Sequence, residues 1–150
     1  MQQQPFGYTF FADDVRQELF GKISLMGIYG SNLIISELPT IIPQIFFATY
    51  AHFPLEQRIT NAKLQIYLPE DLDVPSIVVD LPDWTTEPDL EPAELPFADT
   101  ELWAPFSTFQ KLAPLVINQP GWIRLRIAYD EGRLRVGTLE VQFVPPKGKN

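Results

Sequence analysis

The sequence predicts an all-β protein: a two-sheet antiparallel β-sandwich, immunoglobulin-like or similar, with about eight strands. Short runs of β-branched and aromatic residues recur along the chain, and turns rich in glycine and proline separate them. No stretch has the period of a long amphipathic helix. Because 150 residues suit one domain, we expect a single β-sandwich domain over residues 1–150.

The most strongly patterned stretch is Gly121–Val144, which predicts a β-hairpin that turns at Glu131-Gly132. The alternation slips by one residue in the second arm, which predicts a β-bulge at Gly137-Thr138. The resulting register places Leu125 opposite Leu139, Ile123 opposite Val141 and Arg124 opposite Glu140. We expect a buried core that contains Ile123, Leu125, Ile127, Leu139, Val141, Leu64 and Ile66.

The other strands are predicted from their apolar patterns. Val15–Gly21 is predicted as a turn or short connection, and Pro39 and Pro43 bracket a loop. Ile45–Phe53 is apolar on both faces, as in a strand that is covered on both sides. The predicted strands before the hairpin are Pro5–Asp14, Lys22–Tyr29 and Asn32–Ser36, Ile45–Phe53, Ala62–Leu68, Ile77–Leu81, Phe106–Lys111 and Leu115–Asn118.

An acidic strip interrupts this pattern. Glu70–Glu101 holds eleven acidic residues and no lysine or arginine, whereas the rest of the chain has a net charge of +3. Seven of the fifteen prolines lie between Pro69 and Pro105, a spacing that excludes a helix. Residues 82–105 are therefore predicted as an extended acidic Pro-rich loop, packed on the body through Trp84, Leu90, Phe97 and Trp103.

Composition limits the classes of partner. The net charge of −8 and the acidic strip argue against direct binding of nucleic acid. No apolar run approaches the ~18 residues of a membrane helix, and the N-terminal segment lacks the pattern of a signal peptide. The chain has no cysteine, which excludes disulfides and thiolate metal sites. We therefore expect a cytoplasmic protein that does not bind membranes.

The segment that begins at Phe11, FADDVRQELFGKISLMGIYG, resembles the opening of a family of small uncharacterised bacterial and prophage proteins. The resemblance covers about residues 1–50 and the last strand region, and not the acidic middle. It implies a fold and a phage-related origin, and it implies no chemistry. The positions that match are Asp13, Asp14, Val15, Arg16, Gly21, Lys22, Gly27, Tyr29, Pro120, Gly121 and Trp122.

Catalytic residue types are scarce. Asp13 and Asp14 are adjacent carboxylates, but neighbours on a strand point to opposite faces, so we expect one of them to bond Arg16 or to cap a turn. His52 is the only histidine, which excludes His-based catalytic pairs and multi-histidine metal sites. No nucleotide-binding or nucleophile motif occurs. We expect no enzymatic activity and no cofactor.

One alternative is a loop-borne Ca²⁺ or ligand-binding domain. Ca²⁺ takes six to eight oxygen ligands, and Glu70, Asp71 and Asp73 are close together in the strip. They lack the glycine and the spacing of a helix-loop-helix calcium loop. Acidic clusters are also common on solvated faces.

The favoured prediction is a non-enzymatic protein-interaction or accessory module. The acidic loop would bind a protein partner with a basic surface, and a body with separated charges also predicts homo-oligomers. A further alternative is a phage-type inhibitor whose acidic strip imitates nucleic acid. The hairpin's outer face is the second candidate surface, since tryptophan and arginine are typical of interaction hot spots. The alternative is an ordinary polar sheet face. The residues on it are Trp122, Arg124, Arg126, Arg133 and Arg135. The predicted partner-binding residues are Asp83, Glu87, Asp89, Glu91, Glu94, Trp122, Arg124 and Arg126.

Overall fold

The computed structural model describes residues 4–54, 58–85, 103–130 and 132–148, and it is all-β in this part of the chain, as predicted. One short 3-10 turn, η1 (Leu19–Gly21), joins the first two strands. None of the described residues forms a helix that is long and apolar enough to span a membrane. The strands are β1 (Phe6–Gln17), β2 (Ile23–Ile28), β3 (Asn32–Ile35), β4 (Thr40–Ile42), β5 (Ile45–Pro54), β6 (Arg58–Ile59), β7 (Lys63–Tyr67), β8 (Ile77–Asp80), β9 (Trp84–Thr85), β10 (Trp103–Leu112), β11 (Leu115–Ile117), β12 (Gly121–Tyr129) and β13 (Gly132–Phe143).

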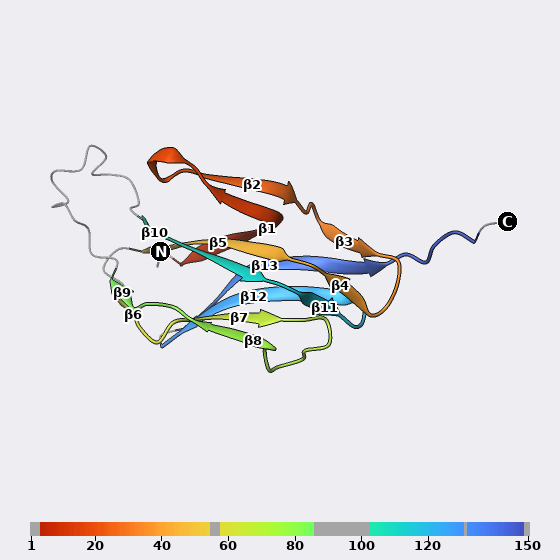
Figure 1. Cartoon of the computed structure of the whole chain (residues 1–150). Helices are drawn as coiled ribbons and strands as arrows, with labels where there is room; N and C mark the ends of the chain where they lie inside the picture. Colours follow the sequence, from red (N-terminus) through yellow and green to blue (C-terminus); the bar gives the residue numbers. More distant parts are fainter. Residues whose placement is uncertain (1–3, 55–57, 86–102, 131, 149–150) are drawn as a thin grey trace.

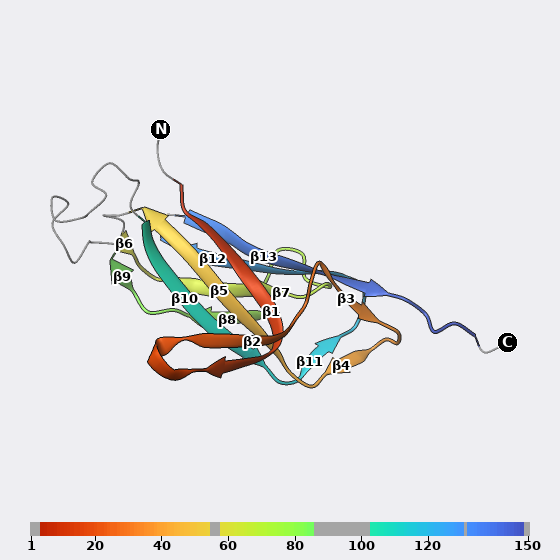
Figure 2. The ribbon, with the colours of Figure 1, turned by 90° about the horizontal axis from the view of Figure 1, so that it is seen from above.

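Two larger sheets form the body. The first, sheet A, has the order β10-β5-β1-β2, and the second, sheet B, has the order β3-β13-β12-β7-β8. Sheet A lies above sheet B in Figure 1, and β1, β5 and β10 run side by side across it in Figure 2. Two small ribbons, β11-β4 and β6-β9, complete the described strands. One pair departs from the antiparallel prediction, because β13 and β3 are parallel.

The core lies between these sheets and contains side chains from both of them. Phe47 and Phe53 of β5 are fully buried, as are residues of β7, β12 and β13. The predicted core is confirmed, since each of its members is at most 2% exposed: Ile123, Leu125, Ile127, Leu139, Val141, Leu64 and Ile66.

The hairpin contains the expected bulge, but the predicted register is wrong by two residues. Tyr129 pairs with Gly132, so the chain reverses earlier than a turn at Glu131-Gly132 would allow. Glycine suits position 132, because a Cβ there would lie 3.2 Å from the Tyr129 hydroxyl. As a result Leu125 lies opposite Gly137, Ile123 opposite Leu139 and Arg124 opposite Thr138.

The register shifts between Leu125 and Arg126, and Val136 is the extra residue rather than Gly137-Thr138. Val136 points into the core and is 1% exposed. A Cβ on Gly137 would lie 2.8 Å from Thr9 Cβ, and a Cβ on Gly7 would lie 2.8 Å from Val136 Cγ1. Glycine at these two positions therefore allows β1 and β13 to approach closely across the core.

Several element boundaries differ from the predictions. β1 continues through Val15 to Gln17, where a turn was predicted, because its distal half pairs with β2. β4 forms inside the loop that Pro39 and Pro43 bracket. β9 and the start of β10 fall within predicted loop 82–105. Proline is tolerated at Pro105 because β10 is an edge strand of sheet A.

Candidate functional site

Asp13 and Asp14 are neighbours on β1 and bond to different partners. The Tyr29 hydroxyl donates to Asp13 Oδ1 at 2.8 Å, whereas Asp14 accepts from Arg16 Nε at 3.4 Å and from Val15 N at 3.0 Å. The two carboxylates therefore do not form a shared catalytic site. The expected bond from one of them to Arg16 is confirmed.

Gly27 allows Asp13 and Tyr29 to meet. Its φ is 63°, and a Cβ at this position would collide with Asp13 Oδ2. Tyr29 N also donates to Phe11 O at 2.8 Å, and Gln44 Nε2 donates to Asp13 O at 2.9 Å. Asp13, Gly27 and Tyr29 thus form a structural cluster that holds the chain after β2 against β1, which accounts for three positions of the N-terminal pattern.

We expect Tyr29 to ionise late. Burial raises its pKa from 10.0 to about 12, with further contributions from the hydrogen bond and the charge of Asp13. Because the fold favours the neutral form, this stabilisation is fully present below pH ~10 and is lost as the pH rises through the folded pKa. Ultraviolet absorbance titration should show that Tyr29 ionises at a lower pH in Asp13→Asn than in the parent. The Tyr29→Phe variant assigns the transition to Tyr29. An unchanged midpoint would contradict the contribution of Asp13.

Asp71 has a structural role, because its carboxylate closes a turn. It accepts from Leu68 N at 2.8 Å, from Ser76 N at 2.9 Å and from Ser76 Oγ at 2.8 Å. Burial on its own would raise the pKa of Asp71, but the bonds from Ser76 and Leu68 and the charge of Arg124 lower it overall. Glu70 accepts from Asn118 Nδ2 at 3.2 Å.

The calcium alternative required Glu70, Asp71 and Asp73 to act together. Within residues 4–54, 58–85, 103–130 and 132–148, no three His, Asp or Glu side chains are arranged to hold a metal ion. Asp71 directs its oxygens at the turn that it closes, and Ca²⁺ binding by Glu70, Asp71 and Asp73 stays a prediction.

The acidic strip is described only at its start. Asp83 Oδ1 accepts from Asn61 N at 2.9 Å, so this predicted partner contact stabilises the turn at Asn61, whose φ is 52°. Asp80 forms an ion pair with Lys63 at 3.2 Å. The remaining predicted contacts and anchors lie outside the described residues: Glu87, Asp89, Glu91, Glu94, Leu90 and Phe97.

The predicted Trp122, Arg124 and Arg126 do share the outer face of β12. Trp122 is 50% exposed. Arg124 has a structural role, because its Nη2 donates to Leu72 O at 3.2 Å and to Asp71 O. The expected ion pair between Arg124 and Glu140 is absent among the described residues, since Glu140 lies opposite Trp122 and accepts from Gln142 Nε2.

Arg135 was predicted on the outer face of the hairpin, and the corrected register places it directly opposite Arg126. We name Trp122, Arg124, Arg126 and Arg135 the arginine face. The Arg126 guanidinium lies 5.2 Å from the centre of the Tyr67 ring, which orients it. Ion pairs in the described part of the chain are Arg16–Asp14 and Lys63–Asp80, so neither Arg126 nor Arg135 has a carboxylate partner there.

A hollow of about 150 Å³ opens on the arginine face beside the bulge. The bulge creates it, because Val136 and Gly137 both face the core and leave the outer side of β13 short of side chains. Its lining residues are Arg124, Leu125, Arg126, Arg135, Gly137 and Thr138. The arrangement offers guanidinium donors and a hydroxyl around a space of the size of a small oxyanion.

A second surface, which the sequence analysis missed, lies on the outer side of sheet A. The register forms three rows across β1, β5 and β10. In the first, His52 lies between Phe6 and Pro105. In the others, Tyr50 lies between Tyr8 and Ser107, and Ala48 between Phe10 and Phe109. We name the aromatic face by its rings, which are Phe6, Tyr8, Phe10, Tyr50, His52, Trp103 and Phe109.

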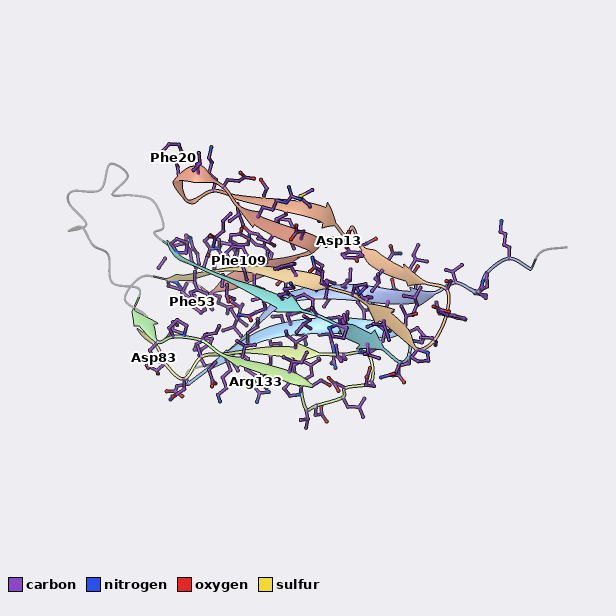
Figure 3. The ribbon with its side chains drawn as sticks, viewed as in Figure 1. Asp13, Phe20, Phe53, Asp83, Phe109 and Arg133 are labelled. Carbon is purple, nitrogen blue, oxygen red and sulfur yellow. The ribbon has the colours of Figure 1, made fainter. Side chains whose placement is uncertain are left out.

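These rings contact one another continuously. Phe6 stacks on His52 with centroids 4.7 Å apart, and Tyr8 stacks on Tyr50 at 5.4 Å. Trp103 meets Phe6 edge-on at 5.1 Å. Figure 3 shows Phe109 at β10, below the β1–β2 hairpin, and Arg133, which shares the outer side of β13 with Arg135, at the lower edge of the body. The aromatic face and the arginine face therefore lie on opposite sides of the described structure.

Sequence signals for the aromatic face were present. Phe6, Tyr8 and Phe10 alternate on one side of β1, while Phe11 on the other side is 4% exposed. The double-sided apolar pattern of Ile45–Phe53 was interpreted as a strand covered by a layer on each side. In the described ranges of the chain, the outer side of β5 lies among rings from β1 and β10, the neighbouring strands of its own sheet.

The fold and the two faces define an all-β protein that exposes one cationic and one aromatic surface on opposite sides. Comparisons with protein-family models, curated proteins and solved structures returned no match for this chain.

Proposed function

We propose that the protein is a non-enzymatic interaction module, a β-sandwich of immunoglobulin-like or similar type with a phage-related origin. It acts through two charged regions. The arginine face binds a carboxylate-bearing protein segment, and the acidic Pro-rich segment 82–105 binds a partner with a basic surface. The observation that best supports this proposal is the Arg126–Arg135 pair, which has no carboxylate partner among the described residues.

Like charges directly opposite on neighbouring strands destabilise a sheet by roughly 0.2–1 kcal/mol. Arg126 and Arg135 occupy such a pair, and both side chains lie on the face that borders the hollow. A bound anion would remove this repulsion. The repulsion between the two arginines, which destabilises the free protein, is then offset when a partner binds. This behaviour is expected of a binding site rather than of an ordinary sheet face.

The chemistry of the pair favours carboxylate. Arginine presents its N–H donors in a planar fork that matches carboxylate and phosphate oxygens in two-point contacts. The hollow of about 150 Å³ has room for one carboxylate or phosphate group and a few water molecules, since a water molecule takes about 30 Å³. Trp122, 50% exposed on the same strand, supplies an aromatic contact for the neighbouring side chain of the bound segment.

The acidic segment supports the second half of the proposal by its sequence. Glu87, Asp89, Glu91 and Glu94 lie among prolines, which reduce the entropy that an extended segment loses on binding. Attraction to a basic surface acts over about a Debye length, ~8 Å at physiological salt. Asp83 belongs to the fold rather than to this contact, because it accepts from Asn61 N.

Calorimetry with an acidic peptide of alternating glutamate and glycine tests the arginine face. We expect binding that weakens as salt rises, and that falls by about tenfold, or ~1.4 kcal/mol, in Arg126→Gln with Arg135→Gln. Lys22→Gln with Lys147→Gln removes the same number of positive charges from exposed positions outside the hairpin and is the matched control. Inorganic phosphate in place of the peptide distinguishes a general oxyanion site from a carboxylate site. Equal binding by the parent and the double variant would refute the proposal.

A further inference from the structure

The aromatic face is unusual for a surface in a chain with so many charges. The three strand segments that form it, Phe6–Ala12, Ile45–Pro54 and Trp103–Leu112, contain no acidic residue, and their one basic residue is Lys111. Charged residues make up 20% of the chain. Lys111 lies at the end of the face, 5.8 Å from the centre of the Phe46 ring. The surface is therefore apolar and almost free of charge.

The exposed area of the aromatic face is as large as that of a typical interaction site. Phe6, Tyr8, Phe10 and Phe109 are each 38–46% exposed, and the other rings of the face are partly exposed. Taking ~200 Å² for an aromatic side chain, the face leaves about 500 Å² of ring surface in water. Patches of this size, in the upper part of the range seen on monomers, commonly mark interaction sites.

We propose that two copies of this chain associate through their aromatic faces about a two-fold axis. Two such patches bury about 1,000 Å² in total, which reaches the lower limit for a specific interface. One patch against a smaller apolar surface on another protein would bury less. The size of the face therefore favours a partner with an equally large aromatic surface, which a second copy supplies.

Charge supports the same partner. Each copy has a net charge of −8, so two copies repel one another overall. The aromatic face is a region where like copies meet without opposing carboxylates among the described residues, because its three strand segments carry none. A closed two-fold contact also uses the same patch on both copies, and it leaves the arginine face of each copy free on the far side.

The ring geometry fits a mutual contact better than a flat ligand. Phe6 and His52 lie nearly parallel at 7°, and Tyr8 and Tyr50 at 21°, so one face of each of these rings is covered by its neighbour. Each stacked pair is then less open to a flat ligand than a single ring would be. Edges from one copy can insert between rings of the other in the edge-to-face arrangement that aromatic pairs prefer.

Sedimentation equilibrium from 1 to 100 μM tests this inference. We expect the parent's average mass to rise from that of one chain toward that of two, with a dissociation constant on the order of micromolar for an interface of this size. The double variant Tyr8→Thr with Phe109→Thr should have a dissociation constant for the dimer that is at least tenfold higher. Threonine keeps the β propensity at both sites, and circular dichroism with thermal melting checks that the variant is folded.

The matched control is Val78→Thr with Ile41→Thr, two positions that are 48% and 65% exposed away from this face. It should associate as the parent does. A parent that stays monomeric at 100 μM, or a folded double variant that associates equally well, would refute the inference. Higher salt should not weaken this apolar association, whereas it weakens binding at the arginine face, so the two proposals fail independently.

Discussion

Leu125→Ala is expected to lower the free energy of unfolding by ~2–5 kcal/mol, the usual penalty for lost burial plus a residual cavity. Leu125 is 1% exposed at the centre of β12, with β13 on one side and β7 on the other. Small domains are stable by only ~5–15 kcal/mol. The substitution therefore removes a large part of the total stability.

Urea unfolding followed by tryptophan fluorescence measures this loss. Val78→Ala, a 48% exposed position on edge strand β8, is the control and should change stability by less than ~0.5 kcal/mol. If Leu125→Ala cost less than ~1 kcal/mol, the shared core between the two sheets would be refuted.

Gly27→Ala is expected to have the second large effect on stability. A non-glycine residue in the left-handed region costs ~1–2 kcal/mol, and φ at Gly27 is 63°. The new Cβ would also displace the Asp13 carboxylate, which breaks its 2.8 Å hydrogen bond with Tyr29. We expect a total loss of about 2–3 kcal/mol from strain and the broken bond.

Two neighbouring glycines separate these contributions. Gly21 has φ 71° with nothing within 4 Å of a Cβ, so Gly21→Ala should show the backbone strain alone. Gly30 has neither positive φ nor a close neighbour, so Gly30→Ala should be neutral. Chemical unfolding should show the largest loss of unfolding free energy for Gly27→Ala, a smaller loss for Gly21→Ala and the smallest for Gly30→Ala. Equal losses at Gly27 and Gly21 would show that the Asp13–Tyr29 bond adds nothing.

Local pattern was sufficient to predict the strands and the core. Alternation identified the buried side of β12, β13 and β7, because side chains on a strand have a period of two. The same period cannot fix the register. Pairings that differ by two residues bury the same side chains, so the pattern placed Leu125 opposite Leu139, whereas the structure pairs it with Gly137. The three-dimensional structure, in which Tyr129 pairs with Gly132, distinguishes between them.

The arginine face was predicted only in part, because alternation shows the side of a strand on which a residue lies and not the residue opposite it. Trp122, Arg124 and Arg126 share one side of a strand, which alternation shows directly. Arg133 and Arg135 were also predicted on the outer face of the hairpin, but the position of Arg135 directly opposite Arg126 depends on the register and on the bulge at Val136. The structural roles of Asp71 and Asp83 depend on turns that bring distant backbone N–H groups to their carboxylates. A count of acidic residues cannot reveal such bonds.

The most direct test of the arginine face is a combined measurement of stability and binding on Arg135→Glu. The substitution places a carboxylate opposite Arg126 and turns a repulsive cross-strand pair into an attractive one. We predict that its melting temperature is equal to or higher than the parent's, while calorimetric binding of the acidic peptide is lost. A folded Arg135→Glu protein that binds the peptide as tightly as the parent would contradict the account.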